Sequence, residues 1–307
     1  MLSILTIIHP LVDACSMSVL VSGGMSWQRI LLYNALAFAL QLPLGVLLDA
    51  RSRLARVGFL AGTCLVCAAT LTAACGTNGW GVLSAVCIGN AFFHLTAGKH
   101  VLETYGGRSG PIGLFISTGA LGLLAGQLGV EHAAKACLPT FAVLLAVCVV
   151  VAYGLATGKT TVTPMNGQDV RSPTATDDIP VVPVVILVGL FALVAWRSWA
   201  GLEASRLTAK EGMSLLLAGA AVTWGGKAVG GYLAERIGRW TVTVASVCGS
   251  VTLAFACSPQ NAIAWLVLLF VAQLATGPVL SLVYDRIGRR GGTAFGLNCL
   301  GLFAGSL

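Results

Sequence analysis

Charged side chains are scarce in this sequence. Asp, Glu, Lys and Arg make up 9% of its 307 residues, whereas soluble proteins carry about 25%. Hydrophobic residues account for 57%, and the mean hydropathy is +0.89. One or two soluble domains could not bury so much apolar surface, so a soluble enzyme is excluded. At about 20 residues per crossing, the chain has room for about ten to twelve spanning helices, which predicts an all-α polytopic membrane protein.

The common signatures of catalytic and nucleotide-binding sites are also missing. The sequence has no Gly-x-x-x-x-Gly-Lys-Ser/Thr loop, no His-Glu-x-x-His pair and no Gly-x-Ser-x-Gly elbow, so neither ATP-driven transport nor intramembrane hydrolysis is expected. Most of the ten cysteines stand alone within apolar segments, and Cys64 and Cys67 have no second cysteine or histidine pair near them. We therefore expect no enzyme activity, no cofactor and no metal site.

The net charge of +7 does not indicate a nucleic-acid partner. The basic residues form short clusters between apolar runs, without the aromatic interleaving or the continuous basic face of a nucleic-acid surface. If the N-terminus is cytoplasmic, the inward connections hold 12 of the 18 Lys and Arg residues and the outward connections hold four. This bias predicts a cytoplasmic N-terminus. The first segment lacks the basic start of a signal peptide, which favours a multi-pass protein of a bacterial inner (plasma) membrane.

Apolar stretches separated by charges, glycine or proline predict eleven spanning segments. Their ranges are 1–22, 28–49, 56–75, 79–98, 109–130, 137–157, 181–202, 212–234, 240–258, 262–284 and 292–307. The only long polar stretch, 158–180, is rich in Thr, Pro, Asp and Gly. It predicts a flexible cytoplasmic linker between an N-terminal bundle, 1–157, and a C-terminal bundle, 181–307.

A short motif recurs after the second segment of each half. The first copy contains Gly45, Asp49 and Arg53, the second contains Gly231, Glu235 and Arg239, and a third variant with Asp285 follows the tenth segment. Glycine lets a helix end approach its neighbour, and the acids are expected to form ion pairs with the arginines at the cytoplasmic rim. Ordinary positive loops would explain the arginines but not the repeated register. The repeat therefore predicts a gating latch.

The repeat resembles the signature Gly-x-Leu-Ala-Asp-Arg-x-Gly-Arg of the major facilitator superfamily. The second copy is the closer one, since Ala50 and Ser52 replace the usual Arg and Gly of the first. The resemblance implies two pseudo-symmetric six-helix bundles around a central cavity lined by helices one, four, seven and ten. It also implies twelve spans, so the chain is expected to be a fragment or the product of a truncated gene, with its second bundle incomplete.

A narrower resemblance concerns the fosmidomycin-resistance type of exporter within this superfamily. It is carried by the stretch 89–94 (Gly-Asn-Ala-Phe-Phe-His) in the fourth segment and by His9 and Asp13 in the first. This resemblance implies proton-coupled efflux of a small organic compound. Direction, substrate and oligomeric state do not follow from the residues themselves.

Ionisable residues within spanning helices are functional candidates because their insertion is costly. His9 and Asp13 stand four residues apart and share one face of a helix, where the carboxylate raises the proton affinity of the imidazole. Such a pair can take up and release a proton. The alternatives are that Asp13 neutralises a structural partner such as Lys227, or that both residues face a water-filled mouth without coupling.

Four further residues are candidates for the substrate and proton pathway. His94 lies near the end of its segment, where Lys99, His100 and Glu103 are within reach, although packing alone would also explain it. Arg197 is placed in the outer half of the seventh segment and either snorkels to the interface or binds an anion. Lys227 lies too deep to snorkel and must face a cavity or a carboxylate. Gln273 is a polar candidate of the tenth segment.

These observations favour a secondary active transporter that works by alternating access. The expected partners are protons, the lipid bilayer and a small solute, with an anionic or zwitterionic solute favoured by Arg197 and Lys227. Two other classes remain open: a non-transporting membrane receptor or assembly protein, including a truncated and defunct transporter, and a membrane enzyme acting on lipid. The last would need a cluster of His, Asp or Ser at one membrane face.

Overall fold

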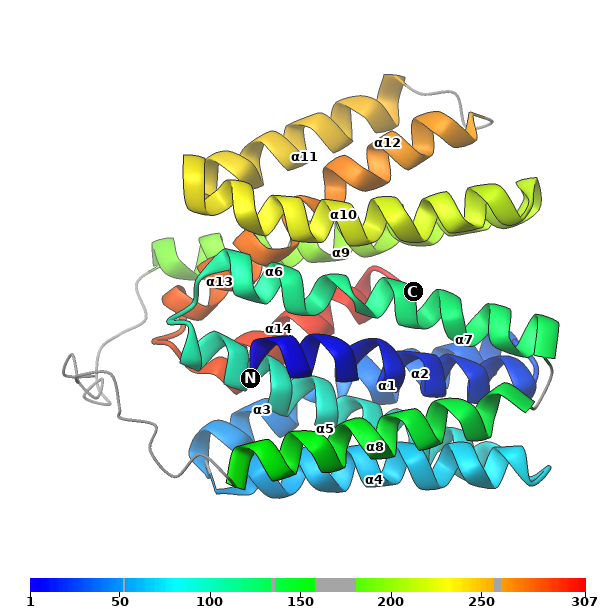
Figure 1. The fold of residues 1–307 in the computed structure, drawn as a ribbon. Helices are drawn as coiled ribbons and strands as arrows, with labels where there is room; N and C mark the ends of the chain where they lie inside the picture. Colours follow the sequence, from blue (N-terminus) through cyan, green and yellow to red (C-terminus); the bar gives the residue numbers. More distant parts are fainter. Residues whose placement is uncertain (52, 134–135, 158–180, 257–260) are drawn as a thin grey trace.

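The structure, a computed structural model, describes residues 1–51, 53–133, 136–157, 181–256 and 261–307. Within these ranges the chain forms helices joined by short turns, and no strand occurs there. The helices run along a common direction, with the N-terminal helices on one side of the molecule and most C-terminal helices on the other (Figure 1). The predicted linker 158–180 lies outside the described ranges, so the boundaries of the two bundles stay predictions.

The helices of the described ranges form eleven segments. The helices are α1 (Leu2–Ser22), α2 (Trp27–Asn34), the π-helix η1 (Ala35–Ala39), α3 (Gln41–Ala50), α4 (Leu54–Ala74), α5 (Trp80–Thr104), α6 (Ser109–Ser117), α7 (Gly119–Ala133), α8 (Cys137–Thr157), α9 (Val181–Glu211), α10 (Met213–Ile237), α11 (Arg239–Ala256), α12 (Ala262–Gln273), α13 (Thr276–Arg286) and α14 (Gly291–Ala304). Helices α2, η1 and α3 form one segment, as do α6 with α7 and α12 with α13.

Lipid explains why these segments are helical throughout. A backbone in hydrocarbon must satisfy its own polar groups, which a helix does within each segment. Nine segments of the described chain are long and apolar enough to cross a membrane. The 14-residue helix α14 is shorter, and α10 carries three charged residues, Lys227, Glu235 and Arg236. The predicted all-α polytopic fold is confirmed.

Besides the segment α2–η1–α3, which has a turn at Leu40, two segments are interrupted near their middle. The segment α6–α7 breaks at Thr118, and the segment α12–α13 breaks at Leu274 and Ala275. Pro278 accounts for the second break, because proline has no N–H to donate to the carbonyl four residues earlier, that of Leu274. An interrupted helix frees backbone groups for other partners, and transporters place such groups at their binding sites.

Close helix contacts join the N-terminal and C-terminal helices. Helix α3 packs along α14, and α6 packs along α10. A Cβ atom at Gly45 would lie 2.2 Å from the carbonyl oxygen of Gly292, and one at Gly231 would lie 2.5 Å from the carbonyl oxygen of Ser109. The absence of a side chain at these positions is what allows the backbones to approach so closely.

The half-helices α6 and α13 also touch each other. The Ser109 hydroxyl donates to the Ser281 hydroxyl over 2.9 Å in a buried contact. A Cβ at Gly277 would lie 2.8 Å from the carbonyl oxygen of Ser109. The first residue of α6 therefore packs against the first half of α13.

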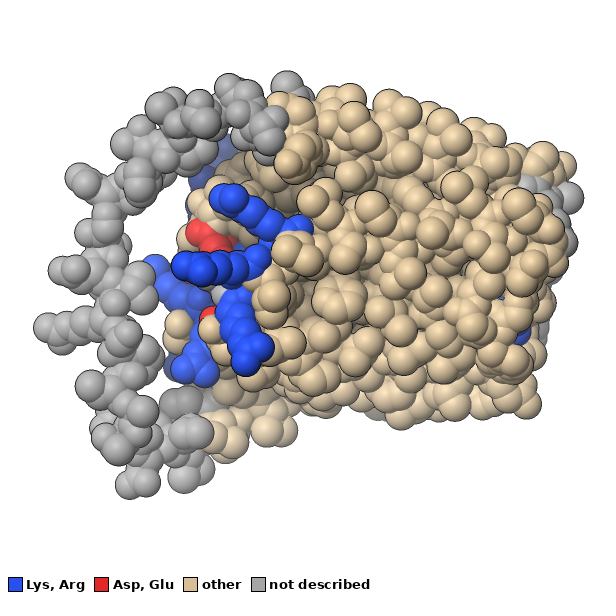
Figure 2. Space-filling view, turned by 90° about the horizontal axis from the view of Figure 1, so that it is seen from below, with Lys and Arg blue, Asp and Glu red and all other residues tan. Residues whose placement is uncertain are grey.

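Charged side chains gather at one end of the molecule. On the face seen in Figure 2, Lys, Arg, Asp and Glu lie at the end where α3 and α10 finish, and the rest of this face is uncharged apart from a small blue area. The exposed basic residues at this end are Arg51, Arg53, Arg56, Arg108, Arg236, Arg286, Arg289 and Arg290. This distribution is the one expected of a protein whose middle is in lipid.

Candidate functional site

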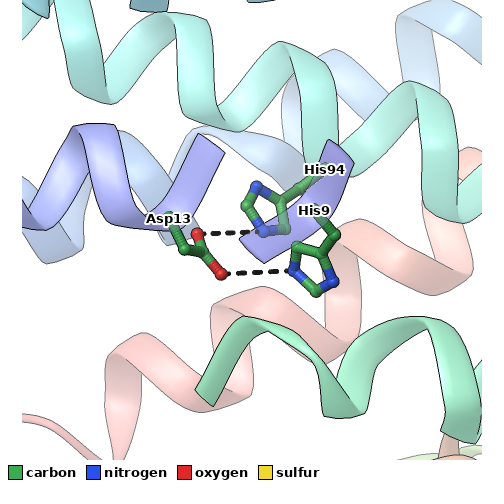
Figure 3. A group of neighbouring side chains, drawn as sticks. All are labelled: His9, Asp13 and His94. Atoms are coloured by element: carbon green, nitrogen blue, oxygen red, sulfur yellow. Dashed lines mark ion pairs between the residues drawn. The ribbon is translucent and has the colours of Figure 1, made fainter. Parts of the chain in front are cut away.

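His9, Asp13 and His94 form a triad inside the membrane-spanning part of the chain (Figure 3). His9 and Asp13 come from α1 and His94 from α5, and the three residues are 3%, 6% and 9% exposed. The Nε2 atom of His9 lies 3.3 Å from Oδ2 of Asp13, and Nε2 of His94 lies 3.3 Å from Oδ1 of the same carboxylate. Each imidazole therefore faces one oxygen of a single carboxylate.

The other nitrogen of each imidazole faces a backbone carbonyl. Nδ1 of His9 lies 2.7 Å from the carbonyl oxygen of Phe115, and Nδ1 of His94 lies 2.9 Å from that of Asn90. A carbonyl only accepts, so each Nδ1 must carry a hydrogen and donate it. In a neutral imidazole this leaves a lone pair on Nε2, directed at the carboxylate. Two lone pairs and a carboxylate then converge, which is favourable only when a cation, either a proton or a metal ion, lies between them.

The helix break positions one of these carbonyls. The Phe115 carbonyl also accepts from the Thr118 hydroxyl at 3.1 Å, at the point where α6 ends. The Phe115 ring stacks on the His9 ring with centroids 4.7 Å apart. Asn90 donates from Nδ2 to Oδ1 of Asp13 and to the Ser16 hydroxyl, both over 3.1 Å. Backbone and side-chain partners thus fix all three members of the triad.

Arg197 belongs to a second buried group, built on the C-terminal helices. Its side chain is 5% exposed and donates from Nη1 to the hydroxyl of Thr276, the first residue after the break in α12–α13. The Thr276 hydroxyl donates to Oε1 of Gln273 over 3.1 Å. Among the described residues, no carboxylate pairs with Arg197. The guanidinium therefore holds a buried positive charge with donors to spare.

Lys227 of α10 interacts electrostatically with both groups, with Asp13 and His94 of the first and with Arg197 of the second. Within the described parts of the chain it forms neither an ion pair nor a hydrogen bond, so the proposed pairing of Asp13 with Lys227 is not seen. Arg197 and Lys227 therefore have no anionic partner among the described residues.

His94 has other neighbours than expected, and one of the two alternatives for Arg197 is excluded. His94 contacts Asp13 rather than Lys99, because five helical residues rotate two side chains by about 140° from each other. Lys99 instead pairs with Asp49, Nζ to Oδ1, over 2.6 Å, and with Glu103. Arg197 is residue 17 of the 31 in α9, one position past the midpoint of the helix. Its buried side chain does not snorkel to the interface.

The first copy of the repeated motif ties α3 to the start of α14. The Asp49 carboxylate accepts from the backbone N–H of Gly292 at 2.9 Å and from the N–H and hydroxyl of Thr293 at 2.7 and 2.8 Å. Lys99 adds the fourth contact. A carboxylate at a helix N-terminus satisfies free backbone donors and complements the helix dipole. The expected pairing with arginine is absent, and Arg53 is exposed without an ion pair to any described residue.

The second copy makes the equivalent contact with α6. Glu235 accepts from the N–H of Gly110 at 2.9 Å and pairs with Arg108, whose Nη2 lies 2.5 Å from Oε2 of Glu235. This hydrogen bond raises the pKa of the exposed Arg108 side chain above its ordinary value. Arg239 pairs with Asp285 at the end of α13. We call the contacts of Asp49 with α14 and of Glu235 with α6 the two latches.

Sequence reasoning overlooked several of the groups that build these sites. Asn90 precedes His94 by four residues, the same spacing that drew attention to His9 and Asp13, so this signal was available. Thr276 precedes Gly277 and Pro278, which together indicate a helix break beside a polar residue. The Phe115 carbonyl and the backbone of Thr293 gave no signal, because their role depends on which helices become neighbours.

Comparisons with known proteins place this geometry in a known fold. No family model and no curated protein matches the sequence. The structure is similar to that of FucP, the fucose:proton symporter of E. coli, with 13% identity and a TM-score of 0.67 over 99% of this chain and 89% of that one. FucP is described as a major facilitator superfamily transporter. The chain has the major facilitator fold.

Two other solved structures show the same likeness. The nucleoside transporter NupG is 14% identical with a TM-score of 0.53, and the match covers 99% of this chain and 90% of that one. A bacterial homologue of the iron transporter ferroportin is 16% identical with a TM-score of 0.54, covering 99% and 89%. His9 and Asp13 of the triad stand on α1, the first helix of the chain, and Arg197 stands on α9, the first helix after the predicted linker.

Proposed function

We propose that this chain is a proton-coupled secondary active transporter, not an enzyme, that moves a small organic solute by alternating access. The triad carries the proposal: three ionisable side chains from two helices meet in the membrane interior, where isolated ones would cost about 2.5–3.5 kcal/mol each. The solved structures of similar fold include a fucose:proton symporter and a nucleoside transporter, which supports this class of function.

Protons bind at the triad. With both Nδ1 atoms donating to carbonyls, a proton added to either Nε2 lies directly against the Asp13 carboxylate and turns a repulsive contact into a charge-assisted hydrogen bond. Loss of that proton restores the repulsion between acceptors. Protonation therefore changes how strongly α1 and α5 interact at the triad. A coupled conformational change requires such a difference in interaction energy between states.

The solute carries a negative group. Arg197 is buried and Lys227 is half-buried, and neither has a described anionic partner. A planar guanidinium fork is suited to a carboxylate or phosphate. Gln273 and Thr276 add polar groups beside Arg197. A zwitterionic solute would also satisfy Lys227 and Arg197 through its anionic end. Transport in the export direction rests on the narrower resemblance to fosmidomycin-resistance exporters alone.

Alternating access requires the latches to open and close. Asp49 and Glu235 each join a helix of one half to the start of a helix of the other half. We place this end at the cytoplasmic face of an inner membrane, with the N-terminus inside, because the exposed arginines gather there. Both latches are closed in this structure.

The test is solute-driven proton movement in proteoliposomes. Lactate, glutamate, inorganic phosphate and choline are added to vesicles that enclose a pH-sensitive dye, with wild type, Asp13→Asn and Glu131→Gln compared. We expect at least one anion or zwitterion to move protons in wild type and in the exposed control Glu131→Gln, and not in Asp13→Asn. Proton movement that survives in Asp13→Asn contradicts coupling at the triad. A response to choline alone contradicts the anion preference, and no response to any solute contradicts transport of this class.

A further inference from the structure

We propose that His9, Asp13 and His94 form a binding site for a divalent first-row transition-metal ion, such as Zn²⁺, Fe²⁺ or Co²⁺. The proposal deepens the proposed function, because the metal ion would take the place of the coupling protons at the same atoms. Metal binding itself does not depend on transport. It departs from the sequence-based expectation that this chain has no metal site.

The ligand types and their spacing fit such an ion. Two imidazole nitrogens and a carboxylate oxygen are ligands that first-row transition metals share, and the potential ligand atoms of the three residues all lie within 4.8 Å of one another. The two nitrogen–oxygen distances are 3.3 Å. Bonds of about 2.0–2.1 Å to a tetrahedral zinc ion place neighbouring ligand atoms about 3.3 Å apart. Each imidazole nitrogen thus already has this spacing from one oxygen of the Asp13 carboxylate.

The hydrogen bonds around the triad are those of metal-bound histidines. A histidine that binds a metal through one nitrogen usually donates its other N–H to a carbonyl or carboxylate, which fixes the ring and its tautomer. Both histidines do this, through the carbonyls of Phe115 and Asn90. Asn90 also donates to the carboxylate of Asp13. These contacts hold the Nε2 lone pairs toward the carboxylate.

Gly119, the first residue of α7, packs directly against two of the ligand side chains. A Cβ atom there would lie 2.5 Å from Oδ2 of Asp13 and 2.8 Å from Nε2 of His9. A single methyl group at this position would therefore press on two ligand atoms, which provides a way to disturb the site without removing a ligand.

The ligand types of the triad disfavour hard cations, and competition with protons makes metal binding depend on pH. Mg²⁺ and Ca²⁺ prefer several oxygen ligands, whereas the triad offers one carboxylate and two imidazoles. Lys227 of α10 and Tyr33 of α2 interact electrostatically with Asp13. The ammonium group of Lys227 opposes a second cation, so Lys227→Gln should tighten metal binding. Since metal and protons compete for the same atoms, binding weakens as pH falls.

The experiment is a Co²⁺ titration of the full chain purified in detergent. Co²⁺ bound by imidazole and carboxylate absorbs visible light, so stoichiometry and affinity are read directly, and Zn²⁺ is added afterwards to displace it. We expect one Co²⁺ per chain, a visible band and release of protons on binding. His94→Gln and Gly119→Ala should weaken binding by about 100-fold or more. The matched control His100→Gln, on the same helix, and Cys64→Ser with Cys67→Ser should bind as wild type does.

Each outcome decides the proposal. Circular dichroism and size-exclusion profiles select the variants that fold, and Gly119→Ala, which keeps all three ligands, stands in if His94→Gln does not. The absence of a Co²⁺ band in wild type, or equal binding by His94→Gln and His100→Gln, overturns the metal site. If proton movement still depends on Asp13 while no metal binds, this inference fails and the proposed function stands. If metal binds at the triad but no solute moves protons, the proposed function alone fails.

Discussion

In the N-terminal half, the break in α6–α7 offers the carbonyl of Phe115 to His9 on α1, while in the C-terminal half the break in α12–α13 offers the hydroxyl of Thr276 to Arg197 on α9. Both halves thus set an ionisable side chain of their first helix against an interrupted one. The two groups need ligands of opposite charge. The N-terminal group converges acceptors that need a cation, and the C-terminal group leaves a cation that needs an acceptor. One backbone arrangement serves two complementary chemistries.

The substitution Arg197→Gln is expected to have the largest effect on one half alone. Losing the guanidinium should weaken binding of the anion that the proteoliposome assay identifies by about 2–5 kcal/mol, the usual effect of truncating one partner of a buried charge pair. The unliganded protein should become more stable, because an unpaired buried charge is costly. Isothermal calorimetry and thermal unfolding measure the two effects. Co²⁺ binding at the triad should not change, and weaker binding of the anion and Co²⁺ alike would contradict the division between halves.

Gly45 and Gly231 lie at the close helix contacts beside the two latches. Substituting them tests how strongly the closed arrangement depends on these contacts. Gly45→Ala and Gly231→Ala each place a methyl group against a backbone carbonyl, 2.2 Å and 2.5 Å away, so the helices must separate. We expect each to destabilise the closed arrangement by about 1–3 kcal/mol. The readout is maleimide labelling of Ser281→Cys in a variant without native cysteines. Ser281 lies on α13 and is buried against α6. Gly81→Ala, where no atom lies within 4 Å, serves as the control, and equal labelling in all three contradicts the prediction.

The two latch carboxylates should differ in strength. Asp49 accepts three hydrogen bonds from α14 and pairs with Lys99 with little exposure, whereas Glu235 accepts one from α6 and pairs with an exposed arginine. Asp49→Asn should weaken the closed arrangement by about 1–2 kcal/mol and Glu235→Gln by less than about 1 kcal/mol. The same labelling assay ranks them. A larger effect of Glu235→Gln would reverse this assignment.

The smallest difference concerns the arginines of the two motif copies. Arg239 pairs with Asp285, while Arg53 is exposed and has no ion pair to a described residue. Arg239→Gln should cost about 0.2–1 kcal/mol, as exposed pairs do, and Arg53→Gln should leave thermal unfolding unchanged. Raising the salt concentration should reduce the Arg239→Gln effect. A loss in Arg53→Gln as large as in Arg239→Gln would show that the first copy also uses its arginine.

The limits of the spanning segments could be predicted from sequence because lipid leaves few options. A segment must be apolar and helical over a nearly fixed length, so composition alone placed α1, α4 and α8 within a few residues. The largest departure is α9, which runs nine residues past its predicted end at 202. Charges such as Glu203 and Arg206 indicated an end there, but a helix continues beyond the apolar stretch as long as water can solvate its side chains.

Contacts within one helix were predictable, and contacts between helices were not. His9 and Asp13 were paired by their spacing along α1, a property of the helix itself. The partner of Asp13 on α5 is 81 residues away, and Asp49 bonds to residues more than 240 positions later. These contacts depend on the order of helices in the bundle, which hydropathy does not contain. The resemblance to a known superfamily supplied the order but not the atoms.

The half-helices α6 and α13 give the molecule a mechanical connection. Helix α6 runs from the Glu235 latch at Gly110 to the carbonyl that holds His9, and α13 runs from Thr276, which holds Arg197, to Asp285. Each is a stiff rod of about 14–17 Å, at 1.5 Å per residue. The two rods touch through Ser109 and Ser281. A cation bound at the end of one rod and an anion bound at the end of the other would therefore act on helices that are packed against each other.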